Sequence, residues 1–114
     1  MKRFGRFSAA VAALAVLALA GCARYEERIA TEVLPEPELY ALVMEKFNNQ
    51  DWDAAIATID RYERLYTSGE HIQELRLRRA DARFNKNTPS SLIVAKADYE
   101  SFLALYPRYE REDY

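Results

Sequence analysis

The pattern of hydrophobic and polar positions in residues 51–67, DWDAAIATIDRYERLYT, predicts an amphipathic α-helix. Apolar side chains recur every three to four residues and form one stripe, while charged residues such as Asp53 and Asp60 lie on the opposite side. The stripe consists of Trp52, Ala55, Ile56, Ile59, Tyr62, Leu65 and Tyr66. We expect the side chain of Asp51 to cap the start of this helix.

The same stripe recurs 40 residues later in residues 91–107, SLIVAKADYESFLALYP. Leu92 corresponds to Trp52 and Ala95 to Ala55. The remaining matches are Tyr99 with Ile59, Phe102 with Tyr62, Leu105 with Leu65 and Tyr106 with Tyr66. Six matches at one offset indicate an internal repeat. Thr88 and Pro89 are a suitable cap and first residue for this second helix, and Pro107 ends it.

Each of these helices is preceded by another apolar stripe. Residues 38–48 carry Leu39, Leu42, Val43 and Phe47 on one face, and residues 70–86 form the corresponding helix 37 positions later. Short connections predict antiparallel hairpins. The expected fold is therefore all-α: two helix hairpins, at 38–67 and 68–107, in a short α-solenoid. Solenoids usually contain three or more repeats, so residues 108–114 are interpreted as the start of a third repeat or as a tail.

The chain begins with a different pattern. Residues 1–21 contain Lys2, Arg3 and Arg6, then an apolar run and a small residue, which is typical of a secretory signal. The apolar run is shorter than the roughly 20 residues that a membrane-spanning helix needs. Residues 22–37 are polar with two close prolines, so we expect a flexible tether, with Pro37 near the first turn of the following helix.

Cys22 ends the sequence Leu-Ala-Gly-Cys, which resembles the lipobox of bacterial lipoproteins. That resemblance implies an acylated cysteine as the first mature residue, which would anchor the chain to a membrane. Cys22 is the only cysteine, so it has no disulfide partner within the chain. A buried free thiol is the alternative interpretation. Apart from lipid on Cys22, no cofactor is expected.

Charge and composition exclude several function classes. Removal of Lys2, Arg3 and Arg6 with the signal leaves 13 Lys and Arg against 18 Asp and Glu, a net charge of −5 that disfavours nucleic acid as a partner. His71 is the only histidine and has no cysteine or second histidine with which to form a metal site, so an exposed residue at a helix start is the preferred interpretation. No phosphate-binding loop or nucleophile motif is present, and the chain is not expected to be an enzyme.

The pattern D-[WY]-x-x-A-I-x-x-[IF] in residues 51–59 resembles the tetratricopeptide repeat. Together with the lipobox, the tether, and the closing LALYP and EDY segments, the chain is similar to the first two repeats of BamD-like lipoproteins of the outer-membrane β-barrel assembly machinery. The resemblance implies a scaffold anchored in the outer membrane, facing the periplasm, with unfolded outer-membrane proteins and assembly components as partners. Val43 and Gln50, where the family tends to have Gly, and Thr67, where it tends to have Pro, depart from its pattern.

Arg76, Arg79 and Arg83 are spaced by three and four and therefore share one helix face. They either form a solvated face paired with acids such as Glu74 and Asp81, or a cationic rim that binds a peptide carboxylate or an acidic loop of a partner. The resemblance favours a rim, because BamD-like proteins are thought to receive the aromatic C-terminal strand of barrel proteins near these repeats.

The remaining candidate binding residues are apolar and lie on the first helix of each hairpin, which lines the concave side of a tetratricopeptide repeat. They are Tyr40, Met44, Phe47, Leu77 and Phe84. Such residues at helical spacing also serve as core. Tyr40 and Met44, at the margin of the apolar face, are the preferred contact residues, whereas Phe47 and Phe84 are expected to serve both roles.

The sequence therefore favours a peptide-binding scaffold of the β-barrel assembly machinery. Alternatives are a general tetratricopeptide lipoprotein that scaffolds another envelope complex, a truncated fragment without function, and an enzyme of an unrecognised class.

Overall fold

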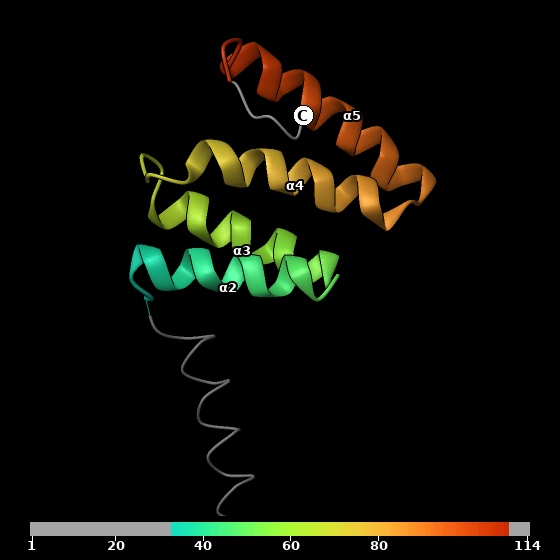
Figure 1. The fold of residues 1–114 in the computed structure, drawn as a ribbon. Coiled ribbons are helices and arrows are strands. Elements are labelled where there is room, and N and C mark those ends of the chain that lie inside the picture. Colours follow the sequence, from blue (N-terminus) through green and yellow to red (C-terminus); the bar gives the residue numbers. More distant parts are fainter. Residues whose placement is uncertain (1–32, 110–114) are drawn as a thin grey trace, which may run out of the picture. The chain divides into compact units, whose positions relative to one another are not determined.

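The computed structural model describes residues 33–109, which form four α-helices and no strand. They are α2 (Glu36–Asn48), α3 (Trp52–Leu65), α4 (Ile72–Lys86) and α5 (Pro89–Leu105). Each helix packs against the next in chain order, antiparallel to it, so that α2/α3 and α4/α5 are hairpins (Figure 1). The predicted all-α hairpin fold is confirmed. The expected signal, Cys22 and most of the tether, as well as residues 110–114, lie outside the described residues.

The helix starts follow from local sequence. The Asp51 carboxylate accepts a hydrogen bond from the Ala54 N–H at 3.3 Å and caps α3, as predicted. Thr88 caps α5 and forms a reciprocal pair with Ser91, in which each side chain accepts the other's backbone N–H. Pro37 lies in the first turn of α2, which begins at Glu36, two residues before the predicted start.

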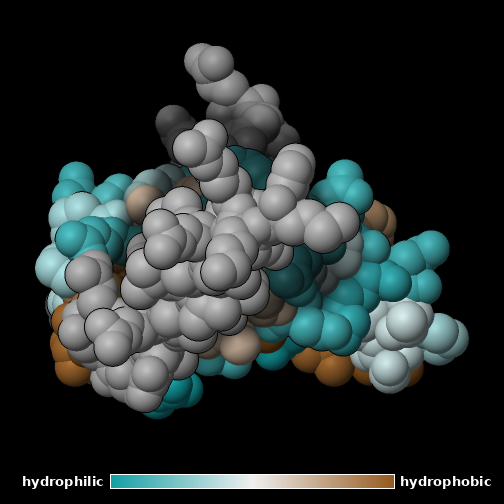
Figure 2. Space-filling model, turned by 90° about the horizontal axis from the view of Figure 1, so that it is seen from below, coloured by the Kyte–Doolittle hydropathy of each residue, from teal (hydrophilic) through white to brown (hydrophobic). Residues whose placement is uncertain are grey.

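The internal repeat is visible in the burial of matched positions. Ala55 and Ala95 are both buried, and so are Tyr62 and Phe102. Small alanines allow the two helices of a hairpin to approach closely. Val43 and Ala80, matched at the offset of 37, are also fully buried. The buried residues thus lie along the predicted stripes. On the face shown in Figure 2, most described residues are hydrophilic, and hydrophobic ones lie toward the edges of the view.

Burial varies along the predicted stripe of α2. Leu39 and Val43 are fully buried, whereas Leu42 and Phe47 are half-buried, which for Phe47 agrees with the expected double role; on α4, Leu75 is also fully buried. Helix α4 begins at Ile72 and not at residue 70, because a turn comes first, with the Gly69 N–H donating to the Tyr66 carbonyl at 2.8 Å.

Gly69 is required in this turn by a close approach. A Cβ atom at this position would lie 2.4 Å from the hydroxyl oxygen of Tyr62 and 3.0 Å from the Tyr66 carbonyl oxygen. Tyr62 is completely buried, so its ring has no free space into which it could move. Hence the tight connection from α3 to α4 depends on a residue without a side chain.

Within residues 33–109, no helix is both long enough and apolar enough to cross a membrane.

Candidate functional site

One side of the repeat pair is formed by α2 and the adjoining face of α4. The Tyr40 hydroxyl donates to both carboxylate oxygens of Glu74, at 3.1 and 3.0 Å, and the Tyr40 ring stacks on the His71 ring with centroids 3.8 Å apart. Tyr40 is half-buried and reaches from the first hairpin to the second. It therefore fixes the junction of the two repeats while part of its surface remains accessible.

His71 differs from the sequence-based interpretation of an exposed helix-start residue. It does precede α4, but its ring is largely covered, and its Nδ1 lies 2.6 Å from a Glu36 carboxylate oxygen. The same oxygen accepts a hydrogen bond from the buried Tyr62 hydroxyl at 2.5 Å, and that hydroxyl accepts the backbone N–H of His71. The start of α2, the end of α3 and the turn before α4 thus meet at one cluster, which we call the Glu36 cluster (Glu36, Tyr62 and His71).

The hydrogen bonds of this cluster shift two pKa values in opposite directions. The bonds from His71 and Tyr62 to the carboxylate hold the pKa of Glu36 below its ordinary value. Burial, together with the hydrogen bond to Glu36, raises the pKa of Tyr62 to about 12. Around neutral pH the carboxylate therefore stays charged and the phenol stays protonated, which is the arrangement that the hydrogen bonds need.

An aromatic pair occupies the other end of the same side. The Phe47 ring meets Trp52 edge to face, with centroids 5.1 Å apart, and the Arg78 guanidinium lies over the Phe47 ring, 5.2 Å from its centroid. Arg78 also lies 3.8 Å from a carboxylate oxygen of Asp81, whose other oxygen accepts the Tyr99 hydroxyl. The Arg78 side chain is 19% exposed, so most of the guanidinium is covered by its neighbours.

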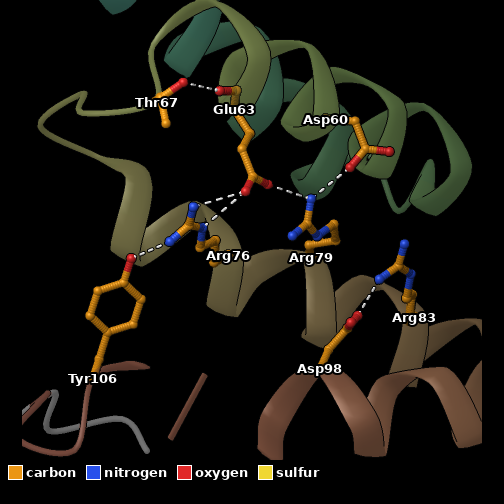
Figure 3. A network of polar contacts seen from close by, with 8 residues as sticks. All are labelled: Asp60, Glu63, Thr67, Arg76, Arg79, Arg83, Asp98 and Tyr106. Atoms are coloured by element: carbon orange, nitrogen blue, oxygen red, sulfur yellow. Dashed lines mark hydrogen bonds and ion pairs between the residues drawn. The ribbon is translucent and has the colours of Figure 1, made fainter. Parts of the chain in front are cut away.

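The three arginines singled out in the sequence lie elsewhere, between α3, α4 and α5 (Figure 3). Glu63 bridges two of them: one carboxylate oxygen accepts from Arg76 at 2.9 Å and the other from Arg79 at 2.8 Å. Arg79 also donates to Asp60 at 2.7 Å. Arg83 pairs with Asp98 on α5. We call this set the α3–α5 ion-pair network.

The electrostatics of the ion-pair network agree with its geometry. Burial raises the pKa of Glu63, but the hydrogen bond from Arg76 and the charge of Arg79 outweigh this, so the pKa lies below its ordinary value. Burial lowers the pKa of Arg79, and the bonds to Asp60 and Glu63 reverse this shift. Both groups remain charged, and each guanidinium is held by carboxylates of another helix.

The structure therefore separates the predicted binding residues. On α4, residues 74, 78 and 81 share one face, from which Glu74 and Arg78 contact α2 and Asp81 contacts Tyr99 of α5. Arg76, Arg79 and Arg83 share the opposite face. The latter are bound by α3 and α5 and do not form an open cationic rim beside Tyr40 and Phe47. The expected acidic partners were also wrong: Glu74 binds Tyr40 and Asp81 binds Tyr99, while Asp60, Glu63 and Asp98 hold the arginines.

The apolar candidates differ in accessibility. Leu77 is buried and serves as core. Met44, like Tyr40 and Phe47, is half-buried on α2, and Phe84 is more than half exposed at the end of α4. Of the candidates on α2, Phe47 lies beneath Arg78, a cation that was not among the predicted site residues. Its position four residues after Glu74 on α4 was the signal that could have identified it.

A small pocket of about 160 Å³ lies between α3, α4 and α5, on the side of the ion-pair network. Glu63, Arg76 and Arg79 form its polar wall, and Phe102 and Leu105 its apolar wall. Its charged groups already bind one another. Among the described residues, no group of three or more His, Cys, Asp or Glu side chains could hold a metal ion.

We call the surface formed by Tyr40, Met44 and Phe47 of α2 and Arg78 of α4 the α2–α4 side. It combines aromatic rings, a thioether and a guanidinium on two helices, an arrangement suited to contacting another polypeptide. No solved structure matches the chain significantly. Residues 33–114 match the YfiO family model, described as outer membrane lipoprotein. This match covers the described helices and most of the chain. The chain therefore belongs to the YfiO family of outer membrane lipoproteins.

Proposed function

We propose that this protein is a BamD-like scaffold of the machinery that assembles β-barrel proteins in the outer membrane. In this proposal, lipid on Cys22 anchors it, the helical repeats face the periplasm, and the α2–α4 side binds peptide segments of client or partner proteins. The protein acts by binding and not by catalysis. Membership of an outer membrane lipoprotein family supports the location, and the chemistry of the α2–α4 side supports the mode of binding.

The observation that carries the proposal is the placement of Arg78 over Phe47. An extended peptide that ends in an aromatic residue offers an apolar ring and a terminal carboxylate. Phe47 and the half-buried Met44 provide apolar contact, while Arg78 provides donors in the planar arrangement that a carboxylate accepts. This replaces the predicted contribution of Arg76, Arg79 and Arg83, whose donors are directed to the acids of α3 and α5.

Two acidic residues beside Arg78 would determine which peptides bind. Glu74 and Asp81 lie on the face of α4 that carries Arg78, where they bind Tyr40 and Tyr99. A peptide rich in acidic residues would be repelled here, whereas a single terminal carboxylate would compete with Asp81 for the partly exposed Arg78 guanidinium. The site is thus suited to mostly apolar segments with one negative group.

Peptide binding tests this mechanism directly. A labelled peptide from the C-terminal strand of an outer-membrane β-barrel protein, ending in Phe, is titrated with the whole chain in detergent, and fluorescence anisotropy is followed. We expect Arg78→Gln to weaken binding about tenfold or more, because a charge-assisted hydrogen bond contributes about 1.5–3 kcal/mol. Amidation of the peptide terminus should weaken binding equally and abolish the effect of Arg78→Gln. Equal binding of the acid and the amide by the native chain would refute carboxylate recognition.

Cross-linking in cells tests the choice of partner. A photo-cross-linking amino acid at Met44 is compared with one at Ala57, which is exposed on α3. The proposal expects adducts with β-barrel proteins or their assembly machinery at Met44 and none at Ala57. Adducts at Met44 with a different envelope complex alone would favour the general scaffold instead.

The anchor is tested separately by intact mass and by labelling with a fatty-acid analogue. Cys22→Ser should abolish the label and leave the protein unanchored. An unlabelled native protein that retains residues 1–21 would contradict the lipoprotein mechanism.

A further inference from the structure

The surface of α5 that points away from α4 carries a regular arrangement of apolar and charged residues. Ile93 is 72% exposed and Leu103 is 64% exposed, and between them lie Lys96 and Glu100 with side chains 81% and 68% exposed. These four residues are spaced by three, four and three, so they form one stripe. We call this stripe the outer face of α5.

The stripe has the same spacing in both directions. When two copies of α5 lie antiparallel about a two-fold axis near residue 98, Ile93 of each copy faces Leu103 of the other, and Lys96 faces Glu100. In the same register Leu92, which is half-buried, faces Ala104, so that a large side chain meets a small one. Such self-complementarity is what a two-fold symmetric interface requires.

We propose that the outer face of α5 binds a second copy of this chain, in an antiparallel pair held by two Ile93–Leu103 contacts and two Lys96–Glu100 ion pairs. The inference rests on α5 alone and does not depend on the peptide-binding function. It leaves the α2–α4 side of both copies accessible.

The charges favour a second copy over a purely apolar partner helix. Lys96 and Glu100 lie in the middle of the stripe, so any partner that covers Ile93 and Leu103 also covers these charges. An apolar helix would remove water from Lys96 and Glu100 without offering either an opposite charge, which is costly. A second copy presents a cation to Glu100 and an anion to Lys96. Within one chain the two groups are 3.9 Å apart, at the outer limit of an ion pair, so they remain available for a closer contact.

The interface is small. Helix α5 has 17 residues, which corresponds to a length of about 25 Å. One helix pair buries less surface than the roughly 1,200–2,000 Å² of a stable complex. The dimer is therefore reversible and should form as the protein concentration rises, as it does when chains are confined to a membrane surface.

Charge reversal gives a specific test. Sedimentation velocity is measured on the whole chain in a non-ionic detergent over a wide concentration range. We expect a monomer–dimer equilibrium for the native chain. Lys96→Glu and Glu100→Lys should each weaken self-association by tenfold or more, because each places like charges opposite one another. An equimolar mixture of the two variants should associate as the native chain does, since the charges are again opposite.

Two exposed leucines provide a matched control. Leu103→Gln should abolish the dimer, whereas Leu105→Gln should leave it unchanged, because Leu105 is 61% exposed but lies on another side of α5. Circular dichroism of each variant checks that the helices are retained. A native chain that stays monomeric at every concentration would overturn the proposal. So would equal effects of the two leucine substitutions, or failure of the mixed variants to associate. Binding of a different protein to the outer face of α5, with no self-association, would also overturn the proposal.

Discussion

Gly69 and Tyr62 lie so close together that substitutions at the two positions should be energetically coupled. A Cβ atom added at Gly69 would lie 2.4 Å from the Tyr62 hydroxyl oxygen. Real Cβ atoms do not approach so closely, and the completely buried ring cannot move freely. We therefore expect Gly69→Ala to destabilise the fold by about 1–3 kcal/mol, as overpacking of a close-packed core does.

Removal of the hydroxyl should relieve much of this clash. Tyr62→Phe alone loses the acceptor of the His71 N–H and the donor to the Glu36 carboxylate, at a combined cost of about 2–4 kcal/mol. In the Tyr62→Phe variant the nearest atoms to the new Cβ are the ring carbon and the Tyr66 carbonyl oxygen, both at 3.0 Å, which small adjustments can accommodate. Gly69→Ala should then cost less than about 1 kcal/mol, so the two substitutions are coupled by about 1–2 kcal/mol.

The assay is urea unfolding of the whole chain, followed by far-ultraviolet circular dichroism, for the native protein, both single variants and the double variant. Ser68→Ala is the matched control, because Ser68 is the exposed neighbour in the same turn and should change stability little. Equal destabilisation by Gly69→Ala in the native chain and in the Tyr62→Phe variant would refute the steric reasoning. Contact of the added Cβ with the Tyr66 carbonyl oxygen, 3.0 Å away, would then be the cause.

Three further predictions concern polar contacts and use the same unfolding assay. Folding lowers the pKa values of Glu36 and Glu63, so their contribution to stability is present above the unfolded-state pKa of about 4.3 and is lost as pH falls through the folded-state values. When both residues are replaced by Gln, the free energy of unfolding should therefore decline less steeply in acid. An unchanged decline would contradict this origin. Arg79→Met should cost about 2 kcal/mol because Asp60 loses its cation and the partly buried Glu63 keeps only Arg76. Lys86→Met, whose partner Asp53 is exposed, should cost well under about 1 kcal/mol. Similar losses for both would show that burial is not decisive. Thr88→Ala should cost about 1 kcal/mol through loss of the α5 cap, and Thr88→Ser should restore most of it; no loss with Ala would contradict the capping role.

The helices were predictable because their signals are local. The stripes of apolar residues, the caps Asp51 and Thr88 and the prolines act within one or two turns of chain, and the repeat provided a second copy of each signal. Burial of Ala55 and Ala95 follows from the same pattern. Helix ends were predicted to within two residues, and the turn that delays α4 depends on Tyr62, a residue of the preceding helix.

The site was predicted less well because its contacts join different helices. Helical spacing shows that Arg76 and Arg79 share a face but not which helix that face meets. Their acids, Asp60 and Glu63, are also three residues apart, and this matching spacing was a usable signal. No comparable signal links His71 with Glu36, 35 residues earlier. Partners at such separations follow from how the hairpins pack, which periodicity alone does not determine.

The ion-pair network joins α3 of the first repeat to α4 of the second, and this position has a consequence for folding. In a solenoid, stability is divided between each repeat and its boundary with the next. Matched charges at the boundary penalise a neighbouring helix that is displaced by one turn, about 5.4 Å, because the bridging Glu63 would then face the wrong side chains. We therefore expect the network to couple the unfolding of the two hairpins and to disfavour a slipped arrangement of α4 against α3.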